Sequence, residues 1–300
     1  MARGQISLRF TPRAIGKVVR SWLPSGSWMD AVYSTLRYVV GQHRLPRYRN
    51  PKLLNDHLFR LRNDGSLLCP LRQFITDKEY VKHYVASVVG SEYTLQTYAV
   101  LRTPGDVDNL ELNRFPCVVK PSHMSGEVVL LHTPGQSVDA NILKKWLSTD
   151  YYKVSREPNY RYLEPKILVE EFFVEPNMEV PRDFKFHCFH GTPRIIQVDL
   201  GRFNNHTRSF YDPSWRRLRI DWAYPPAAEP DSKPSCLPLM LRIAEQLSRS
   251  LSYIRVDMYT DGVAVKVGEM TNCPDGAKRL LRPRSAEVWL GNLFAGTDTT

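Results

Sequence analysis

Two acidic residues interrupt a segment that otherwise has the pattern of a buried β-hairpin. The segment, YIRVDMYTDGVAVKVGEMTNCPDG, runs from Tyr253 to Gly276, and Asp257 and Glu269 lie almost equally far from its Asp261-Gly262 turn. Residues so placed on antiparallel strands face each other, and facing carboxylates repel unless a cation lies between them. Hard oxygen ligands with room for water and phosphate oxygens are typical of a Mg²⁺ site. The hairpin therefore predicts a metal site.

Other polar residues extend the same face of this hairpin. Arg255 precedes Asp257 by two residues, so their side chains lie on the same side of the strand. Thr271 and Asn272 follow Glu269 at the end of the second strand. This face is typical of a binding site rather than a core, although for either acid alone an exposed position on an ordinary strand remains the alternative.

A lysine followed by small residues suggests a place for phosphate. Lys120 ends the apolar run FPCVVKP, and the loop PSHMSG after it contains Ser122, Ser125 and Gly126. Such a loop can lay backbone N–H groups along a phosphate chain. The Walker A and G-x-G-x-x-G patterns are both missing from the sequence, and an ordinary β-turn is the alternative. Lys78 lies at the start of a predicted helix.

Two more strand-like runs carry charged residues. Glu170 and Glu171 follow the apolar residues of KILVEEFF, where adjacent side chains point to opposite faces. Asp183 and Lys185 of DFKFHCFHG lie on one face of a predicted strand. A surface acid, or a surface ion pair in the second case, is the alternative for these residues.

The composition is basic. The 300 residues include 41 Lys and Arg against 31 Asp and Glu, a net charge of +10, which favours anionic partners such as nucleotides, phosphorylated substrates, nucleic acid or a membrane face. Within GRFNNHTR, Arg202, His206 and Arg208 are candidates for holding an anionic substrate, and a basic surface hairpin is the alternative. The first residues, MARGQISLRFTPRAIGKVVRSWLP, are basic as well and would form either a helix on a membrane surface or one packed on the protein.

The expected elements mix helices and hairpins without a regular β-α-β alternation, which indicates an α+β protein built on antiparallel sheets. Before about residue 75 the chain is predicted to be helical and irregular. Later helices are expected near residues 77–90, 138–147, 237–251 and 285–294. Strands are expected at residues 95–101, 115–121, 127–133, 166–173, 183–189, 194–203 and in the hairpin. Five cysteines without C-x-x-C spacing are interpreted as reduced thiols.

In their order, these pieces resemble the ATP-grasp superfamily, and most closely its TupA-like branch, named for teichuronopeptide synthesis. The resemblance spans about residues 40–280 and rests on RYRNPKLLND, TDKEYVKHYV, FPCVVKPSHMSG, ILVEEFF, DFKFHCFHG, GRFNNHTRSFYDPSW and RVDMY...VGEMTNCPDG. It implies an ATP-grasp fold, in which two lobes with antiparallel sheets clamp ATP after a helical N-terminal segment. The corresponding division is residues 1–75, a small lobe at 76–168 with the phosphate loop, and a large lobe at 169–300 with the metal hairpin.

The resemblance also implies roles for individual residues. Lys78 and Lys120 would hold the α- and β-phosphates, and residues 122–126, with Ser122, Ser125 and Gly126, would close over the phosphate chain. Arg255, with Lys120, would act at the transferred phosphoryl group. The base and ribose would be held by Glu170, by the backbone of Glu171, Phe172 and Phe173, and by Asp183 with its neighbour Lys185. The Mg²⁺ ligands would be Asp257, Glu269 and Thr271, the last standing where many ATP-grasp enzymes have Asn; Asn272 would lie toward the substrate.

The family resemblance implies an ATP- and Mg²⁺-dependent carboxylate–amine ligase that forms an amide through an acyl phosphate. The implied setting is the cytoplasmic biosynthesis of a polysaccharide, glycopeptide or related metabolite, with glycan-linked substrates and peripheral membrane contact through the basic N-terminus left open. One alternative is a kinase on the same fold that phosphorylates a sugar hydroxyl. The other is a basic nucleic-acid-binding protein, which would need Lys and Arg clustered with exposed aromatics on one face.

Overall fold

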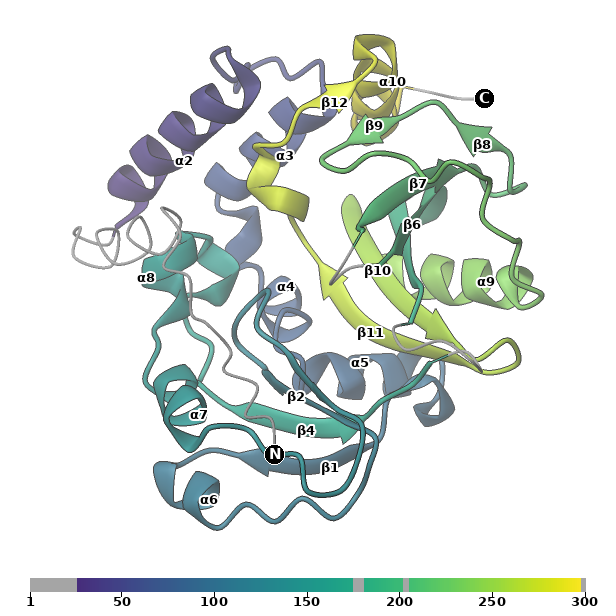
Figure 1. Ribbon diagram of the computed structural model, residues 1–300. Helices are drawn as coiled ribbons and strands as arrows, with labels where there is room; N and C mark the ends of the chain where they lie inside the picture. Colours follow the sequence, from purple (N-terminus) through teal and green to yellow (C-terminus); the bar gives the residue numbers. More distant parts are fainter. Residues whose placement is uncertain (1–25, 175–180, 202–204, 298–300) are drawn as a thin grey trace.

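Two antiparallel sheets organise the computed structural model, which describes residues 26–174, 181–201 and 205–297 (Figure 1). The larger sheet has the strand order β11-β10-β5-β6-β7-β8, and the smaller has the order β1-β4-β2-β3. Strands β9 and β12 form a separate two-stranded ribbon. The strands are β1 (Thr97–Leu101), β2 (Cys117–Pro121), β3 (Val129–Leu131), β4 (Ile167–Glu171), β5 (Asp183–Phe189), β6 (Thr192–Leu200), β7 (Thr207–Tyr211), β8 (Arg217–Leu218), β9 (Asp221–Trp222), β10 (Tyr253–Thr260), β11 (Val265–Thr271) and β12 (Leu281–Arg282).

Helices surround both sheets, and the α+β class predicted from the sequence is confirmed. The α-helices are α2 (Ser27–Gln42), α3 (Leu54–Asn63), α4 (Pro70–Phe74), α5 (Tyr80–Val88), α6 (Pro104–Asp108), α7 (Ala140–Leu147), α8 (Tyr151–Ser155), α9 (Leu237–Ser248) and α10 (Arg284–Ala295). Short 3₁₀ turns cover Ser66–Leu68, Ser91–Tyr93, Pro158–Tyr160 and Pro274–Ala277. The Asp77 carboxylate accepts hydrogen bonds from the backbone N–H groups of Glu79 and Tyr80, as an N-cap residue does, and Lys78 lies in this capping turn just before the regular part of α5.

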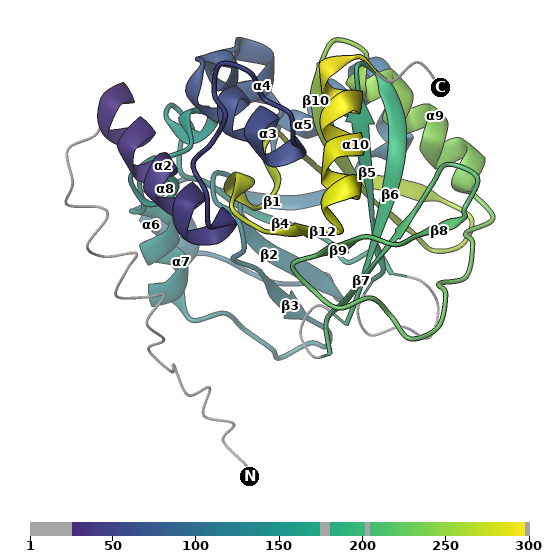
Figure 2. The same ribbon diagram turned by 90° about the horizontal axis from the view of Figure 1, so that it is seen from above.

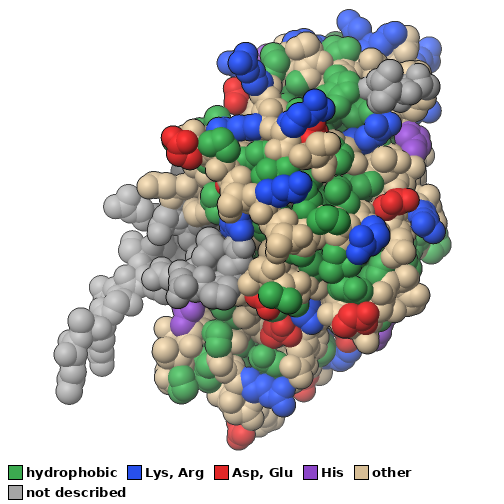
Figure 3. Space-filling model, turned by 90° about the vertical axis from the view of Figure 1, so that its right-hand side faces the viewer, with side chains coloured by type: hydrophobic (Ala, Val, Ile, Leu, Met, Phe, Trp, Pro, Cys, Tyr) green, Lys and Arg blue, Asp and Glu red, His purple; other side chains and the backbone are tan. Residues whose placement is uncertain are grey.

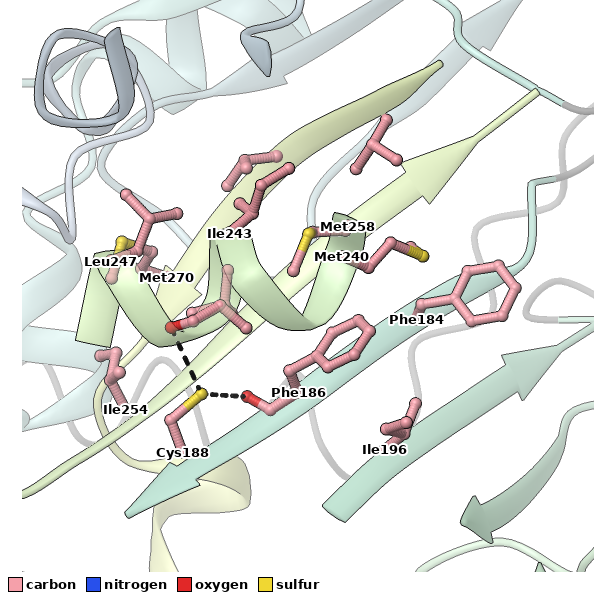
Figure 4. Close-up of a cluster of buried hydrophobic side chains, with 14 of the residues drawn as sticks. Phe184, Phe186, Cys188, Ile196, Met240, Ile243, Leu247, Ile254, Met258 and Met270 are labelled. Carbon is pink, nitrogen blue, oxygen red and sulfur yellow. Dashed lines mark hydrogen bonds between the residues drawn. The ribbon is translucent and has the colours of Figure 1, made fainter. Parts of the chain in front are cut away.

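One face of the larger sheet is apolar and packs on α9 and α5. Residues at alternate positions of a strand point to the same face, so Phe184, Phe186 and Cys188 of β5 lie beside Ile254 of β10 in this core. Figure 4 shows these side chains under α9, where the Cys188 thiol contacts two backbone carbonyls. The intervening residues of the same strands must therefore point to the opposite face.

That opposite face is divided into an apolar end and a polar end. Phe189, Ile195 and Tyr253 lie at its apolar end and pack against α3 and α10 in a second core. Toward the other end, the same strands carry the polar and charged residues of the hairpin and of β5. The large sheet thus positions a row of ionisable side chains over a surface that α3 and α10 leave uncovered.

The smaller sheet has a core of its own with α6 and α7, which includes Val119, Trp146 and Val169. Its strand β4 continues to Glu171, so the smaller sheet extends past residue 168, where the sequence suggested the end of the small lobe. Helix α5, by contrast, contributes Val81 and Val85 to the core of the larger sheet. The division of the chain into lobes stays a proposal, with these two elements spanning its boundaries.

The helical N-terminal region packs on the C-terminal part of the chain. Helix α3 contacts α10, and Leu58 lies in one core with Cys273 and Leu290. Residues 1–25, for which a helix on a membrane surface or one packed on the protein is predicted, lie outside the described residues. Among the residues that the structure describes, none of the helices has the length and apolar character needed to cross a bilayer.

Candidate active site

The centre of the site is an ion-paired cluster on the polar face of the larger sheet. Asp257 of β10 pairs in register with Glu269 of β11 on one side and with Lys185 of β5 on the other, so the predicted facing of the two acids is present. The Arg255 guanidinium donates to both Asp257 oxygens at 2.6 Å, and Lys185 Nζ donates to one of them at 2.7 Å. Lys185 also lies 3.0 Å from Asp183. The cluster therefore alternates positive and negative charge.

Burial makes this charge balance essential. Asp257 is almost fully buried, and although burial raises the pKa of its carboxyl, Arg255 and Lys185 oppose that shift. Burial would likewise lower the pKa of Arg255, but the nearby Asp257 charge raises it overall. A buried charge without its partner is costly. The cluster is thus held together by mutual neutralisation.

Glu269 differs from Asp257 because it faces solvent. Its side chain is 36% exposed and lies 3.4 Å from the Arg255 guanidinium. The Thr271 hydroxyl accepts a hydrogen bond from Arg255 at 3.0 Å and lies 3.4 Å from a Glu269 oxygen. The exposed oxygens at this edge of the sheet therefore belong to Glu269 and Thr271.

These donors can be tested against a divalent cation. Within residues 26–174, 181–201 and 205–297, no group of three or more His, Cys, Asp and Glu side chains is arranged to hold a metal ion. Glu269 and Thr271 offer oxygens to the cleft, whereas both oxygens of Asp257 already accept from Arg255 and Lys185. The set therefore fits Mg²⁺ that brings water and phosphate oxygens of its own, with Arg255 competing for Asp257.

The smaller sheet faces this cluster with a second buried ion-pair group. Lys120 of β2 contacts the carboxylate of Glu170 on the neighbouring strand β4. Lys82, from α5, lies 2.7 Å from the other oxygen of Glu170. Burial raises the pKa of Glu170, but the two ammonium groups outweigh it and hold the pKa below its ordinary value. Glu170 is accordingly a carboxylate between two cations.

The loop after Lys120 is anchored at one end and open at the other. Ser122 is buried, its hydroxyl donates to Asp77 at 3.3 Å, and its carbonyl accepts from the backbone N–H of Lys78. Lys78 Nζ in turn donates to the Met124 carbonyl at 2.5 Å. Burial lowers the pKa of Lys78, while Glu269 across the cleft opposes the shift. Only the far end of the loop, Ser125 and Gly126, lines the cleft.

A slot with several apolar residues in its walls lies between the two sheets. Its walls include Leu95, Val118, Leu130 and the ring of Tyr259. The predicted residues that line it are Lys78, Lys120, Ser125, Gly126, Glu170, Glu171, Phe172, Phe173, Asp183 and Glu269. Gly268 is required at its edge, because a Cβ there would stand 2.4 Å from the Tyr259 ring. The slot thus combines apolar walls with charged residues, which suits an aromatic base bearing a charged chain.

A larger polar cavity of about 630 Å³ adjoins the slot. It shares Lys78, Ser125, Gly126 and Glu269 with the slot and continues past Arg255 and Lys185 to Arg208. The Arg208 guanidinium donates to both oxygens of Asp199, at 2.7 and 3.1 Å. Burial raises the pKa of Asp199, but the nearby His206, Lys185 and Arg208 hold it well below its usual value.

His206 lines the same cavity beside Arg208. Its ring stacks on Tyr224, with centroids 3.7 Å apart, and its Nε2 lies 3.6 Å from Asp199. The structure therefore brings His206 and Arg208 to the cavity, as predicted for residues that meet an anionic substrate. Arg202, the third member of that predicted group, lies outside the described residues.

Asn272 lines the polar cavity, and its polar atoms are held by buried neighbours. Its amide oxygen accepts from Arg72 at 2.8 Å, and its amide nitrogen donates to the Arg72 carbonyl at 3.2 Å and to Thr76 at 3.1 Å. The residue is buried. Its polar atoms join the end of β11 to the segment that leads to Lys78, which indicates a positioning role.

Replacing Asn272 by alanine is expected to lower the free energy of unfolding by about 2–3 kcal/mol, because a buried Arg72 loses a partner. Urea denaturation of the variant measures this loss. The exposed Asn109→Ala provides the control and is expected to change stability by less than about 0.5 kcal/mol. Unchanged stability combined with a raised substrate KM would contradict this assignment and favour direct contact with substrate.

Several functional neighbours were not predicted from the sequence. Lys82 and Lys166 are each separated in sequence by nearly the length of the predicted small lobe from the acids that they hold; Lys166 Nζ lies 3.0 Å from Asp77 and 2.5 Å from Glu79. Asp199 and Tyr259 sit in ordinary strand patterns. The alternation of β6 places Gln197 and Asp199 on the polar face, and that alternation was the one available signal for Asp199.

The family and fold are shown by comparison with known proteins. Residues 59–295 match the family model described as TupA-like ATPgrasp, whereas no curated protein sequence matches the chain. D-alanine–D-alanine ligase from Bacillus anthracis is similar at 17% identity over 75% of this chain and 67% of that chain, with a TM-score of 0.44. The corresponding ligase from Helicobacter pylori is similar at 17% identity over 74% of this chain and 61% of that chain, with a TM-score of 0.38.

A third similar structure is the ATP-grasp ligase PsnB with its minimal precursor, Mg and ADP, at 12% identity over 82% of this chain and 67% of that chain, with a TM-score of 0.41. The chain thus spans 61% of the Helicobacter pylori ligase, and likeness at this level carries no information on substrates. The family match covers most of the chain, including both sheets and the hairpin. The chain therefore belongs to the TupA-like ATP-grasp family, and the predicted fold is confirmed.

Proposed function

We propose that the protein is an ATP- and Mg²⁺-dependent carboxylate–amine ligase. The observation that carries this proposal is the continuity of the cleft. The slot that Lys78 and Lys120 line opens directly into the polar cavity, where Glu269 lines both and Arg255 lines the cavity. A nucleotide in the slot would direct its terminal phosphate toward a substrate in the cavity.

In this proposal the slot holds ATP. Leu95, Val118 and Tyr259 would pack on the adenine, and the backbone of residues 171–173 would meet its edge. Asp183 at the slot border would accept from the ribose hydroxyls. The phosphate chain would run along Lys120 and Lys78 under Ser125 and Gly126. The two ammonium groups supply positive charge of the kind that a triphosphate requires.

The metal ligands belong to the proposal as well. Glu269 and Thr271 would hold Mg²⁺ from the cleft side, and Asp257 would join them as Arg255 turns toward the phosphate. Bound there, the ion would supply charge that offsets the phosphate oxygens. Arg255 is suited to this exchange, because a guanidinium serves a carboxylate and a phosphate with the same donor geometry.

The proposed chemistry has two steps. A substrate carboxylate oxygen attacks the γ-phosphorus of ATP, forming an acyl phosphate as the bond to ADP breaks. An amine nitrogen then attacks the acyl carbon, the C–O bond to phosphate breaks, and the amine proton is released. Arg255, Lys78 and Lys120 would offset the negative charge that gathers during the first step. Closure of the open end of the loop, at Ser125 and Gly126, over the cleft would keep water from the acyl phosphate.

The experiment that tests the ligase proposal is trapping with hydroxylamine. Incubating the protein with ATP, Mg²⁺ and a panel of carboxylates, with hydroxylamine as the amine, is expected to yield a hydroxamate in amounts equal to the phosphate released. The alternative, a kinase on the same fold, would leave a stable phosphoester and no hydroxamate. Mass spectrometry distinguishes the two products, and ATP consumption without either would contradict both.

The class of acceptor and the cellular setting of the reaction are part of the same proposal. The cations around the polar cavity favour an acceptor with several negative charges, such as an acidic glycan, glycopeptide or related metabolite in a cytoplasmic biosynthetic reaction. Membrane contact through residues 1–25 would suit a lipid-linked acceptor. A nucleic-acid partner is less well supported, because on the face shown in Figure 3 the Lys and Arg side chains are interspersed with acidic and apolar ones.

The pH dependence of acceptor binding provides a further test. Burial and the neighbouring Arg37 lower the pKa of Lys278, which lines the polar cavity, to about 8, with Asp275 and Glu157 opposing and Arg279 adding to the shift. Lys278 is therefore charged below pH 8 and loses its charge above it. For an anionic acceptor we expect KM to rise about tenfold between pH 7 and pH 9.

The matched variants for this measurement are Lys278→Met and Lys233→Met, the second being an exposed lysine. Lys278→Met should raise KM at pH 7 and abolish the rise in KM near pH 8. Lys233→Met should leave the dependence of KM on pH as in the wild type. An unchanged profile in Lys278→Met would show that the acceptor does not bind near this lysine.

A further inference from the structure

Helix α2 exposes its apolar residues and buries its polar ones. Trp28, Val32, Leu36 and Val40 follow one another at four-residue spacing, and their exposed fractions are 73%, 38%, 61% and 75%. Side chains at this spacing lie on one face of a helix. We call these four residues the α2 apolar stripe. The helix lies at the rim of the molecule in both ribbon views (Figures 1 and 2).

Polar contacts fix the opposite face of the helix to the protein. Ser34 Oγ donates to Asn63 at 2.7 Å, the Tyr38 hydroxyl donates to Asp56 at 2.6 Å, and Gln42 donates to the Arg279 carbonyl at 2.9 Å. Farther along this face, Asp30 accepts from the hydroxyl of Tyr152. The helix could not turn its stripe inward without breaking these directional bonds. The stripe is therefore a fixed feature of the surface.

Cations border the stripe on one side. A groove of about 1030 Å³ runs between α2 and the segment at residues 278–282. Leu36 and Val40 form one wall, and the charged residues that line the groove are Arg37, Asp221, Lys278, Arg279 and Arg282. Four of these five side chains are basic. A partner that covers both the apolar row and the basic groove must therefore supply apolar groups and negative charge.

The groove is also continuous with the polar cavity. Arg37, Tyr224 and Lys278 line both. Whatever covers the stripe thus lies at the mouth of a path toward the proposed acceptor site.

We propose that the α2 apolar stripe and its basic groove dock on an anionic phospholipid surface. Amphipathic surfaces that combine large apolar residues with Arg and Lys bind at the boundary between acyl chains and headgroups. Trp28 is of the residue type that favours this boundary. A second copy of the chain fits less well, because two-fold pairing of the stripes would bring the basic grooves of both copies close together.

The experiment is sedimentation of the full chain with vesicles of phosphatidylglycerol and phosphatidylcholine, compared with vesicles of phosphatidylcholine alone. It needs no ATP turnover, so its result is independent of the proposed ligase activity. We expect binding to the anionic vesicles to exceed binding to the neutral ones, and to weaken as salt is added. Removing one cation of the groove, in Arg282→Gln, is expected to weaken binding about fivefold.

A matched pair of variants tests the stripe itself. Val40→Glu adds a charge to the stripe, and Val263→Glu adds one to the turn between β10 and β11, where the side chain is 85% exposed. The first is expected to lower vesicle binding about tenfold, through lost apolar insertion and added repulsion. The second is expected to have little effect. Because both positions are exposed, circular dichroism should show both variants folded.

Other outcomes would overturn the proposal. An equal loss of vesicle binding in Val40→Glu and Val263→Glu would indicate a general charge effect. Equal binding of the wild type to neutral and anionic vesicles would show that the cations of the groove do not contribute. Binding that disappears when residues 1–25 are deleted, yet is unchanged in Val40→Glu, would assign docking to the N-terminal segment. A wild-type dimer in light scattering that Val40→Glu dissociates would identify a second copy as the occupant of the stripe.

Discussion

Replacing Lys120 by methionine is expected to lower ATP-dependent phosphate release by about a hundredfold or more, the usual cost of removing one fixed electrostatic group from a transition state. Lys120 stands at the end of β2, beside the buried Glu170, and lines the slot. Methionine preserves the unbranched stem that packs in the sheet, so the change removes chiefly the charge. Single-turnover phosphate release measures the loss, and thermal unfolding reports whether the small sheet is intact.

Lys82→Met is the matched control for this prediction. Lys82 holds the same carboxylate at 2.7 Å, but it projects from α5 and also donates to the Leu95 carbonyl and the Thr97 hydroxyl. If Lys120 served only to neutralise Glu170, the two variants would lose stability and activity alike. The proposal expects similar losses of stability, with the larger loss of activity confined to Lys120→Met.

Local patterns predicted the β10–β11 hairpin and the central strands well. The Asp261-Gly262 turn sets the approximate register of the two strands and placed Asp257 and Glu269 nearly opposite, and an irregularity in the pairing between Asp257 and Met258 brings the two acids directly opposite each other. The alternation in β5 likewise placed Asp183 and Lys185 on one face, although their ion pair is buried rather than on the surface. Such features depend on neighbours in sequence, which is why the sequence is sufficient for them.

Features that depend on distant segments could not be predicted in this way. The apolar spacing in residues 29–43 indicates a helix, and α2 is present, but periodicity does not say which face turns inward. The contacts that decide it come from α3 and from residue 279. Similarly, Asn272 follows the metal hairpin in sequence, and only its contacts with Arg72 and Thr76 reveal that it joins two segments.

The two acids of the hairpin should respond differently to neutralisation. Glu269→Gln is expected to lower turnover about a hundredfold and to weaken Mg²⁺-dependent ATP binding, with little change in stability because the Glu269 side chain is 36% exposed. Asp257→Asn is expected to lower turnover as strongly and also to lower the free energy of unfolding by about 3 kcal/mol, because Arg255 and Lys185 are left buried with less compensation. Calorimetry with and without Mg²⁺, and urea denaturation, measure the two effects.

Glu229→Gln, at an exposed position in the loop before α9, is the control for a general change of charge. If Glu269→Gln weakens ATP binding equally with and without Mg²⁺, then Glu269 serves the nucleotide directly or through Arg255, and its assignment as a metal ligand is wrong. If Asp257→Asn loses Mg²⁺ dependence while keeping its stability, the two cations find other partners, such as Asp183 and Glu269. The hairpin would then be able to release Asp257 to a metal ion at little energetic cost, as the proposed exchange of Arg255 from carboxylate to phosphate requires.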